Sequence, residues 1–169
     1  METLYTIMPS KIGDILIARN GLGITDISFQ EGSSALIPPP EWQRDDSAFA
    51  DIISQLNAYF DGELQEFDLP LAPQGTDFQL DVWQQLQTIP YGFTTTYGDI
   101  AYELGNPKAT RAVGAANGRN PIPIVIPCHR VIGSDGRLIG FRGGIEFKEA
   151  LLGLERHGRL LLARQLALF

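Results

Sequence analysis

Three prolines stiffen one apolar run of the chain, and the run ends in the only cysteine. The segment reads NPIPIVIPCHRVIG and covers residues 120–133. Each proline fixes φ and lowers the flexibility of the backbone that leads to Cys128. Asn120 precedes Pro121 and is therefore biased toward an extended conformation, from which its amide can tie two segments together. Such a stiff approach to a single thiol suits either a small buried side chain or a nucleophile held in place.

The neighbours of Cys128 favour an ionised thiol. A cysteine with a pKa of about 8.5 is only a few per cent thiolate near pH 7, so a nucleophile needs a base or a positive environment. His129 adjoins the cysteine and Arg130 follows it, and both favour the anion. An inert buried thiol beside a structural histidine is the alternative. It leaves unexplained why both residues stand beside a basic helical segment.

The composition is that of an ordinary soluble globular protein, with 169 residues, 44% apolar and 20% charged. This length allows one large domain or two small ones that share a core. A single cysteine excludes an intrachain disulfide and a zinc cluster of several thiols. We expect a cytoplasmic protein with no secretory signal, no membrane span, no cofactor and no metal. The terminal RLLLARQLALF predicts a short amphipathic helix.

The charge is distributed unevenly around the total of -7. Residues 1–76 carry three basic and twelve acidic side chains, whereas residues 77–169 carry ten basic and eight acidic ones. Within 104–142 there are six basic side chains and one acidic side chain. Attraction to phosphates depends on the local field over about 8–10 Å, so this stretch can bind nucleic acid despite the acidic total. A basic stretch without function is the alternative.

The pattern along the chain predicts two lobes, 1–76 and 77–169. Residues 4–10, 14–20 and 23–30 are strand candidates separated by turn signals, as in a meander. Apolar residues at helical spacing follow within 46–64, and Gly62 ends that helix. The proline-bearing LPLAPQGT is the expected boundary. Another amphipathic helix then begins, capped by Thr76 or Asp77.

Residues 95–120, TTYGDIAYELGNPKATRAVGAANGRN, predict a helix, a turn and a second helix. The first begins near Tyr97 and stops at Gly105, while Asn106 and Pro107 are expected to cap and start the second. The second helix has an apolar face that comprises Ala109, Ala112, Val113 and Ala116. Its outer face is almost bare and comprises Arg111, Ala115 and Gly118. A bare face suits close packing inside the protein, or entry into a DNA groove.

Three segments together resemble one family. PIPIVIPCHRVIG is similar to the active-site segment of the O6-alkylguanine-DNA alkyltransferases, YGDIAYELGNPKATRAVGAANGRNP to their DNA-binding segment, and GFRGGIEFKEALLGLE to the segment that follows. The resemblance covers residues 78–155 strongly, and the N-terminal lobe in length and coarse pattern. It implies an α/β fold: an N-terminal ribonuclease H-like α+β lobe, then a mostly helical, winged helix-turn-helix lobe.

The resemblance also implies the roles of the catalytic residues. Cys128 matches the nucleophile that takes the alkyl group, and His129 matches the residue that deprotonates it through water. Glu155 matches the acid that orients the histidine, by the relay logic of a cysteine protease. Asn120 matches a hinge between the recognition helix and the active site.

For DNA and base binding, Arg111 matches an arginine that fills the gap left by a flipped nucleotide. Tyr97 matches a tyrosine that crowds the 3′ phosphate and bonds the flipped base. The carbonyl of Val131 and the N–H of Arg142 match groups that read guanine, and Phe141 stands at a flat pocket wall. The remaining predicted DNA- or base-binding residues are Ala112, Gly114 and Gly143.

The resemblance thus implies repair of alkylated double-stranded DNA by a monomer. The alkyl group of O6-alkylguanine would pass stoichiometrically to Cys128 after nucleotide flipping, and O4-alkylthymine is left open as a second substrate. The product is a thioether, which has no carbonyl for water to attack, so one turnover inactivates the protein irreversibly.

Two other classes of protein remain as alternatives. A non-enzymatic lesion-binding module of the same family would lack the cysteine. A cysteine hydrolase built on Cys128, His129 and Glu155 would draw its cysteine and histidine from separate segments. It would also leave the arginine-bearing helix pair without a role.

Overall fold

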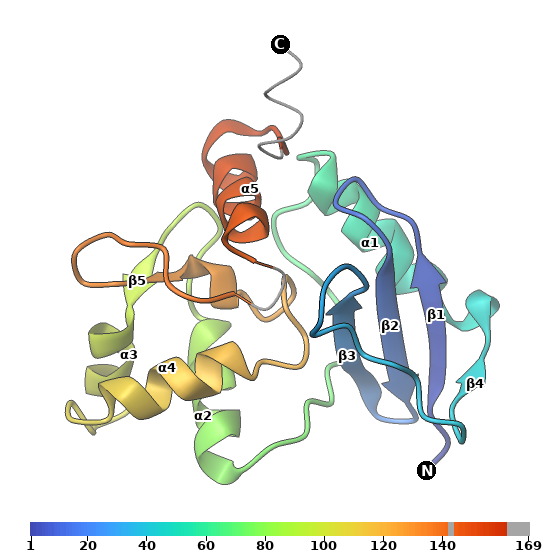
Figure 1. Cartoon of the computed structure of the whole chain (residues 1–169), viewed down its shortest axis with the longest axis horizontal. Coiled ribbons are helices and arrows are strands. Elements are labelled where there is room, and N and C mark those ends of the chain that lie inside the picture. The colour runs from blue at the N-terminus through green and yellow to red at the C-terminus, as the bar shows by residue number, and fades with distance from the viewer. Residues whose placement is uncertain (142–143, 162–169) are drawn as a thin grey trace.

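The structure, a computed structural model, describes residues 1–141 and 144–161. The four strands of the N-terminal half are β1 (Leu4–Met8), β2 (Ile15–Asn20), β3 (Gly23–Phe29) and β4 (Gln43–Arg44), followed by the 3-10 helix η1 (Asp46–Phe49) and by α1 (Ala50–Phe60). The C-terminal half contains α2 (Asp77–Leu86), β5 (Thr95–Thr96), α3 (Tyr97–Glu103), α4 (Thr110–Gly118), the 3-10 helix η2 (Cys128–Arg130), β6 (Val131–Ile132) and α5 (Ile145–His157). The predicted mixed fold, with a sheet first and helices after it, is confirmed (Figure 1).

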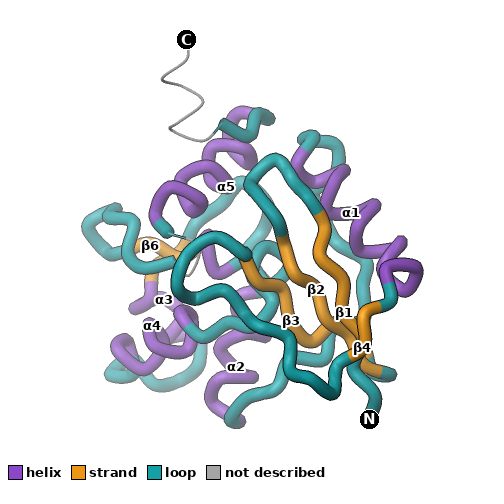
Figure 2. Tube along the Cα trace, turned by 45° about the vertical axis from the view of Figure 1, so that its right-hand side comes forward, coloured by secondary structure: helices purple, strands orange, loops and turns teal. Residues whose placement is uncertain are grey.

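The N-terminal sheet has the strand order β3-β2-β1-β4. The first three strands pair antiparallel as the meander predicts, whereas β4 pairs parallel to β1 at the far edge. The connection 30–42 crosses one face of the sheet to reach that edge, and α1 lies behind the other face (Figure 2). Residues 15–18 of β2 are therefore buried on both faces.

The segment between the two halves is fixed to the sheet. The N–H of Ile24 donates to the Pro70 carbonyl at 2.8 Å, and the N–H of Ala72 donates to the Ile24 carbonyl at 2.7 Å. Gly23 has φ of +151°, and a Cβ there would lie 2.5 Å from the Pro70 oxygen. Only glycine allows this close approach of two backbones. The predicted boundary is thus an ordered strap along β3.

The helix that follows the strap begins as the sequence predicts. Thr76 is the N-cap of α2, and its side chain and that of Gln79 form a reciprocal capping box. Trp83 of α2 donates its indole N–H to the Ala116 carbonyl at 2.8 Å. This bond fixes α4 on α2, so the helix with the bare face is held by a buried anchor.

The second helix of the pair starts later than predicted. The carbonyl of Asn106 accepts from the N–H of Ala109 at 2.9 Å, and so closes a turn before the helix. α4 then begins at Thr110 with Ala109 as its N-cap, so Asn106 and Pro107 neither cap nor start it. The predicted faces of this helix also need correction: Val113, Ala116 and Asn117 are buried, whereas Ala112 is exposed. The bare outer face is thus wider than the sequence indicates.

The two halves share one hydrophobic core. The N–H of Ile27 in β3 donates to the Pro121 carbonyl at 2.8 Å, directly in the segment that leads to the cysteine. The ring of Phe29 stacks on Phe147 of α5, with centroids 5.5 Å apart and planes 2° apart. The N-terminal half thus braces both the cysteine segment and the last helix.

Beyond α5, Gly158 adopts a left-handed conformation and closes the helix. Residues 159–161 are not helical, and the rest of the predicted terminal helix, 162–169, lies outside the described residues. Among residues 1–141 and 144–161, no helix is long and apolar enough to cross a membrane.

Candidate active site

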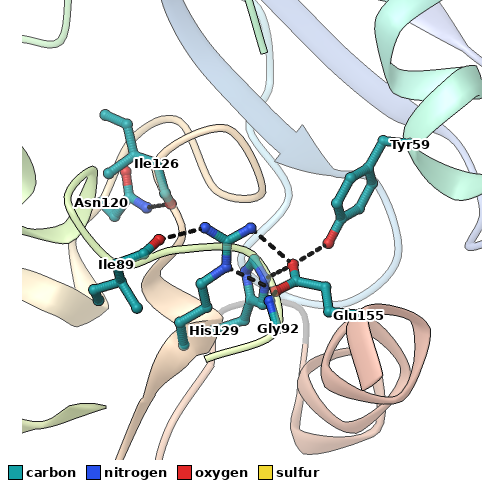
Figure 3. Close-up of polar contacts among 8 residues, drawn as sticks. Tyr59, Ile89, Gly92, Asn120, Ile126, His129 and Glu155 are labelled. Carbon is teal, nitrogen blue, oxygen red and sulfur yellow. Dashed lines mark hydrogen bonds and ion pairs between the residues drawn. The ribbon is translucent and has the colours of Figure 1, made fainter. Parts of the chain in front are cut away.

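Cys128 opens η2 at the end of the proline-rich run and has 5% of its surface exposed. Its N–H donates to the Ile126 carbonyl at 2.8 Å. Asn120 holds the run from the other side, because its Nδ2 donates to that same carbonyl at 2.7 Å and its Oδ1 accepts from the N–H of Ile122 at 3.0 Å. The amide therefore ties two parts of the segment together, as its position before Pro121 suggests (Figure 3).

His129 is completely buried and pairs with Glu155, with 2.6 Å between Nε2 and Oε2. Burial lowers the pKa of His129, although the hydrogen bond and the charge of Glu155 oppose that effect. A neutral imidazole that donates from Nε2 leaves a lone pair on Nδ1. Nδ1 is buried and has no hydrogen-bond partner among the described residues. The ring is thus set to accept a proton at Nδ1.

Glu155, on α5, accepts hydrogen bonds from donors in three segments (Figure 3). Oε2 accepts from the hydroxyl of Tyr59 at 2.6 Å and from Nη2 of Arg130 at 3.1 Å, while Oε1 accepts from Nε of Arg130 at 2.7 Å and from the N–H of Gly92 at 3.2 Å. Burial alone would raise the pKa of Glu155, but the hydrogen bonds from His129, Arg130 and Tyr59 outweigh it and hold the pKa well below its usual range. The carboxylate is therefore ionised, and no oxygen of it is left without a donor.

Arg130 has a different role from the one its sequence position indicates. Its guanidinium binds both oxygens of Glu155, donates to the Ile89 carbonyl at 2.7 Å and lies over the ring of Tyr91. The buried charge is thus paired with a carboxylate and does not serve the thiol directly.

A buried cation does interact electrostatically with Cys128. Lys148 of α5 has no exposed surface and donates Nζ to the Val131 carbonyl at 2.6 Å and to the Ile139 carbonyl at 3.0 Å. Burial lowers the pKa of Lys148, and Cys128 opposes that effect by raising it. Two carbonyl acceptors suit an ammonium group, and the reciprocal effect of its charge is to stabilise the thiolate.

A groove of about 580 Å³ leads toward the thiol. Of the predicted DNA- and base-binding residues, Tyr97, Arg111, Gly114 and Phe141 line it. A much smaller cavity of about 10 Å³ continues inward, shares the wall of Asn117, Gly118, Gly140 and Phe141, and reaches Cys128. The groove has room for a planar ligand, and the inner cavity has room for little more than one small group.

Tyr97 is the first residue of α3, half-buried, and its hydroxyl donates to the Ile139 carbonyl at 3.2 Å. Burial raises the pKa of Tyr97, and Cys128 raises it further. The phenol therefore keeps its proton and can act as a hydrogen-bond donor at the groove wall.

The other predicted residues are distributed less simply. Ala112 is exposed on the outer face of α4 and is absent from the residues that line the groove. Val131 is buried in β6, and its carbonyl already accepts from Lys148, which leaves it one lone pair. Arg142 and Gly143 lie outside the described residues. Among the residues that are described, no group of three or more His, Cys, Asp or Glu side chains could hold a metal ion.

The sequence reasoning missed two residues of this site, Tyr59 and Lys148. Lys148 and Glu155 are seven positions apart, so they lie on one face of α5 among apolar residues, and a charge on such a face is a signal that could have been used. Tyr59 gives no such signal, because it contacts Glu155 across 96 positions of sequence.

Two family models match the chain. The 6-O-methylguanine DNA methyltransferase, ribonuclease-like domain, matches residues 3–73, and the 6-O-methylguanine DNA methyltransferase, DNA binding domain, matches residues 77–157. Together they cover nearly all of the described chain.

Curated relatives and solved structures agree with these matches. The chain is 51% identical over 151 residues to a methylated-DNA–protein-cysteine methyltransferase of Methanosarcina acetivorans, covering 89% of this chain and 97% of the relative. It is 50% identical over 152 residues to that of Mycobacterium tuberculosis, covering 90% and 92%. The crystal structure of Mycobacterium tuberculosis OGT in complex with DNA superimposes with a TM-score of 0.86 at 49% identity, covering 92% of this chain and 94% of that one.

Removing the charge of the buried Lys148 should make Cys128 less reactive. Lys148→Met keeps the length of the side chain and removes the cation beside the thiol. We expect Cys128 to react about ten-fold more slowly with iodoacetamide at pH 7, because losing about 1.4 kcal/mol of charge interaction raises a thiol pKa by about one unit. The rate of carboxymethylation against pH measures this effect.

Lys108→Met is the matched control, since it removes the same charge from an exposed position. Equal thiol reactivity of the two variants across the pH range would show that Lys148 does not stabilise the thiolate.

Proposed function

The chain belongs to the 6-O-methylguanine DNA methyltransferase family, and from this membership we propose how its own residues carry out the reaction. It is a DNA-repair methyltransferase that transfers an alkyl group from DNA directly to a protein cysteine. The acceptor in this proposal is Cys128, the chain's single cysteine. The observation that carries it is the buried His129–Glu155 pair. Nδ1 of His129, the residue next to Cys128, has no hydrogen-bond partner among the described residues.

The proposed step transfers the alkyl carbon from oxygen to sulfur. Nδ1 of His129 takes the thiol proton through a water molecule, and the thiolate of Cys128 attacks the alkyl carbon. The S–C bond forms as the C–O6 bond breaks, and the electron pair of that bond stays on the guanine. Tyr97, whose raised pKa keeps it protonated, would turn its hydroxyl from the Ile139 carbonyl to the base as negative charge develops on the base. The guanine leaves with one proton, which balances the proton that the thiol gave to His129, and the protein keeps the alkyl group as a thioether.

Nucleotide flipping brings the alkyl carbon to the thiol. A base inside a duplex cannot meet a side chain that is 5% exposed at the base of a groove. Arg111, on the groove wall, would fill the space left in the stack. The exposed small residues of α4 allow that helix to lie close to the DNA, which suits entry from the minor groove.

The remaining assignments follow from the same family membership. The N–H of Arg142 and the carbonyl of Val131 would read the flipped guanine, and Ala112, Gly114 and Gly143 are the further DNA- or base-binding residues. Residues 1–76 and 77–169 form the two lobes of a cytoplasmic monomer. O6-alkylguanine in double-stranded DNA is the substrate, with O4-alkylthymine as a further candidate, and the thioether ends the protein's activity after one transfer.

Replacing the acceptor tests this proposal. Cys128→Ala should abolish transfer of labelled methyl from methylated duplex DNA to the protein, whereas binding of that duplex should persist, because the groove and α4 do not depend on the sulfur. Filter retention of the label and fluorescence anisotropy with the same duplex measure the two quantities. Loss of DNA binding together with transfer would mean that the thiol is structural.

Replacing the arginine tests the flipping step. Arg111→Ala should slow repair of a methylated duplex by at least about ten-fold, because unstacking a nucleotide costs a few kcal/mol, and should barely slow transfer from a free O6-alkylguanine base. Single-turnover rates with both substrates measure the difference. Arg119→Ala, also exposed, removes the same charge as a control. Equal slowing of both substrates by Arg111→Ala would remove its role in flipping.

A further inference from the structure

Within the residues that the structure describes, the hydroxyl of Tyr59 makes the one hydrogen bond between the N-terminal half and the carboxylate of the proposed relay. Tyr59 stands near the end of α1, completely buried, and its ring is enclosed by Phe60, Phe67 and Tyr91 at centroid distances of 5.4–6.2 Å. Figure 3 shows the side chain pointing from α1 toward Glu155. This aromatic enclosure leaves the hydroxyl little freedom to go elsewhere.

Tyr59 and His129 share a single oxygen of Glu155. Each lies 2.6 Å from Oε2, so the two donors draw on the same lone-pair density. A carboxylate that already accepts a strong bond from a phenol attracts a proton on the neighbouring imidazole less strongly. Arg130 acts in the same direction, since it binds both oxygens.

We propose that Tyr59 is a positioning residue of the alkyl transfer, whose hydroxyl shares Oε2 of Glu155 with His129 and so keeps the imidazole neutral and its Nδ1 open to the thiol proton. The proposal rests on the proposed function, in which His129 is the base. It gives the acidic N-terminal half a chemical role, because the relay is complete only when α1 is docked on α5.

Five groups face the His129–Glu155 pair, and they set the sign of the expected effect. Tyr59 comes from α1, Tyr91 from the segment after α2, Cys128 and Arg130 from η2, and Lys148 from α5. Arg130 and Lys148 both oppose a charged imidazole. Removal of the Tyr59 hydroxyl offers the carboxylate charge more fully to His129, so the imidazole takes up a proton at higher pH. Below neutral pH, His129 is then protonated and can no longer accept the thiol proton.

Tyr59→Phe is the variant that tests this, because it keeps the enclosed ring and removes only the oxygen. The rate of a single methyl transfer from methylated duplex DNA should be measured from pH 5 to pH 9. We expect the acid limb to move up by about one pH unit, so that transfer at pH 6 falls about ten-fold while the rate at pH 8.5 stays near that of the unchanged protein. The His129 ring resonances should titrate at correspondingly higher pH, with exposed His157, the only other histidine, as the reference signal.

Tyr91→Phe is the matched control. It removes a hydroxyl from the adjacent ring, and that hydroxyl forms no hydrogen bond with any described residue, so the pH profile should keep its position. In a Glu155→Gln background, Tyr59→Phe should cause no further shift of the acid limb, because the carboxylate through which it acts is gone.

Three results would overturn the proposal. One is an acid limb and His129 titration unchanged in Tyr59→Phe. The second is a uniform slowing at every pH that persists in the Glu155→Gln background, since that is the signature of a packing role. The third result needs no variant and so applies even if Tyr59→Phe does not fold. It would be the absence, in the unchanged protein, of a slowly exchanging proton signal from the Tyr59 hydroxyl. Failure of the proposed function is distinguishable from these, because the unchanged protein would then transfer no methyl to Cys128 at any pH.

Discussion

The buried carboxylate of Glu155 is the point on which the site depends. It accepts from His129, Tyr59, Gly92 and Arg130, four residues that come from three separate segments, and a charge buried without such donors would cost several kcal/mol. Each donor is fixed in turn by the carboxylate, so α1, α5 and the cysteine segment must be docked before the relay exists. The same contacts that hold the two halves together therefore orient the imidazole next to the thiol.

The groove joins this buried centre to the surface that is proposed to bind DNA. Tyr97 and Arg111 stand on its walls, and only the narrow inner cavity reaches Cys128. The inner cavity beside the sulfur has room for about one water molecule, so a thiolate there is stabilised by fixed charges such as Lys148 and not by bulk solvent. In the proposed function, one rigid segment stiffened by prolines thus holds the acceptor Cys128 at the end of a narrow cavity.

Much of this site could be predicted from the sequence, because its chemistry is concentrated in a few local motifs. The proline run, the adjoining Cys128 and His129, and the capping residue Thr76 obey short-range rules, and the structure follows them. Local rules fail where a tertiary contact uses the same group. Asn106 does not cap α4 because its carbonyl closes a turn, and the charge of Arg130 goes to a carboxylate that is 25 positions away. The Tyr59 contact joins residues still farther apart, and no pattern in one sequence records such a pair.

The most direct measurement of the central claim is the intact mass of the protein before and after exposure to an excess of methylated duplex DNA, followed by mapping of the modified peptide. The account predicts a gain of one methyl group per chain, located on Cys128, with no further lesion removed once every chain carries it. Removal of lesions by a protein whose mass does not change, or continued removal beyond one lesion per chain, would contradict it.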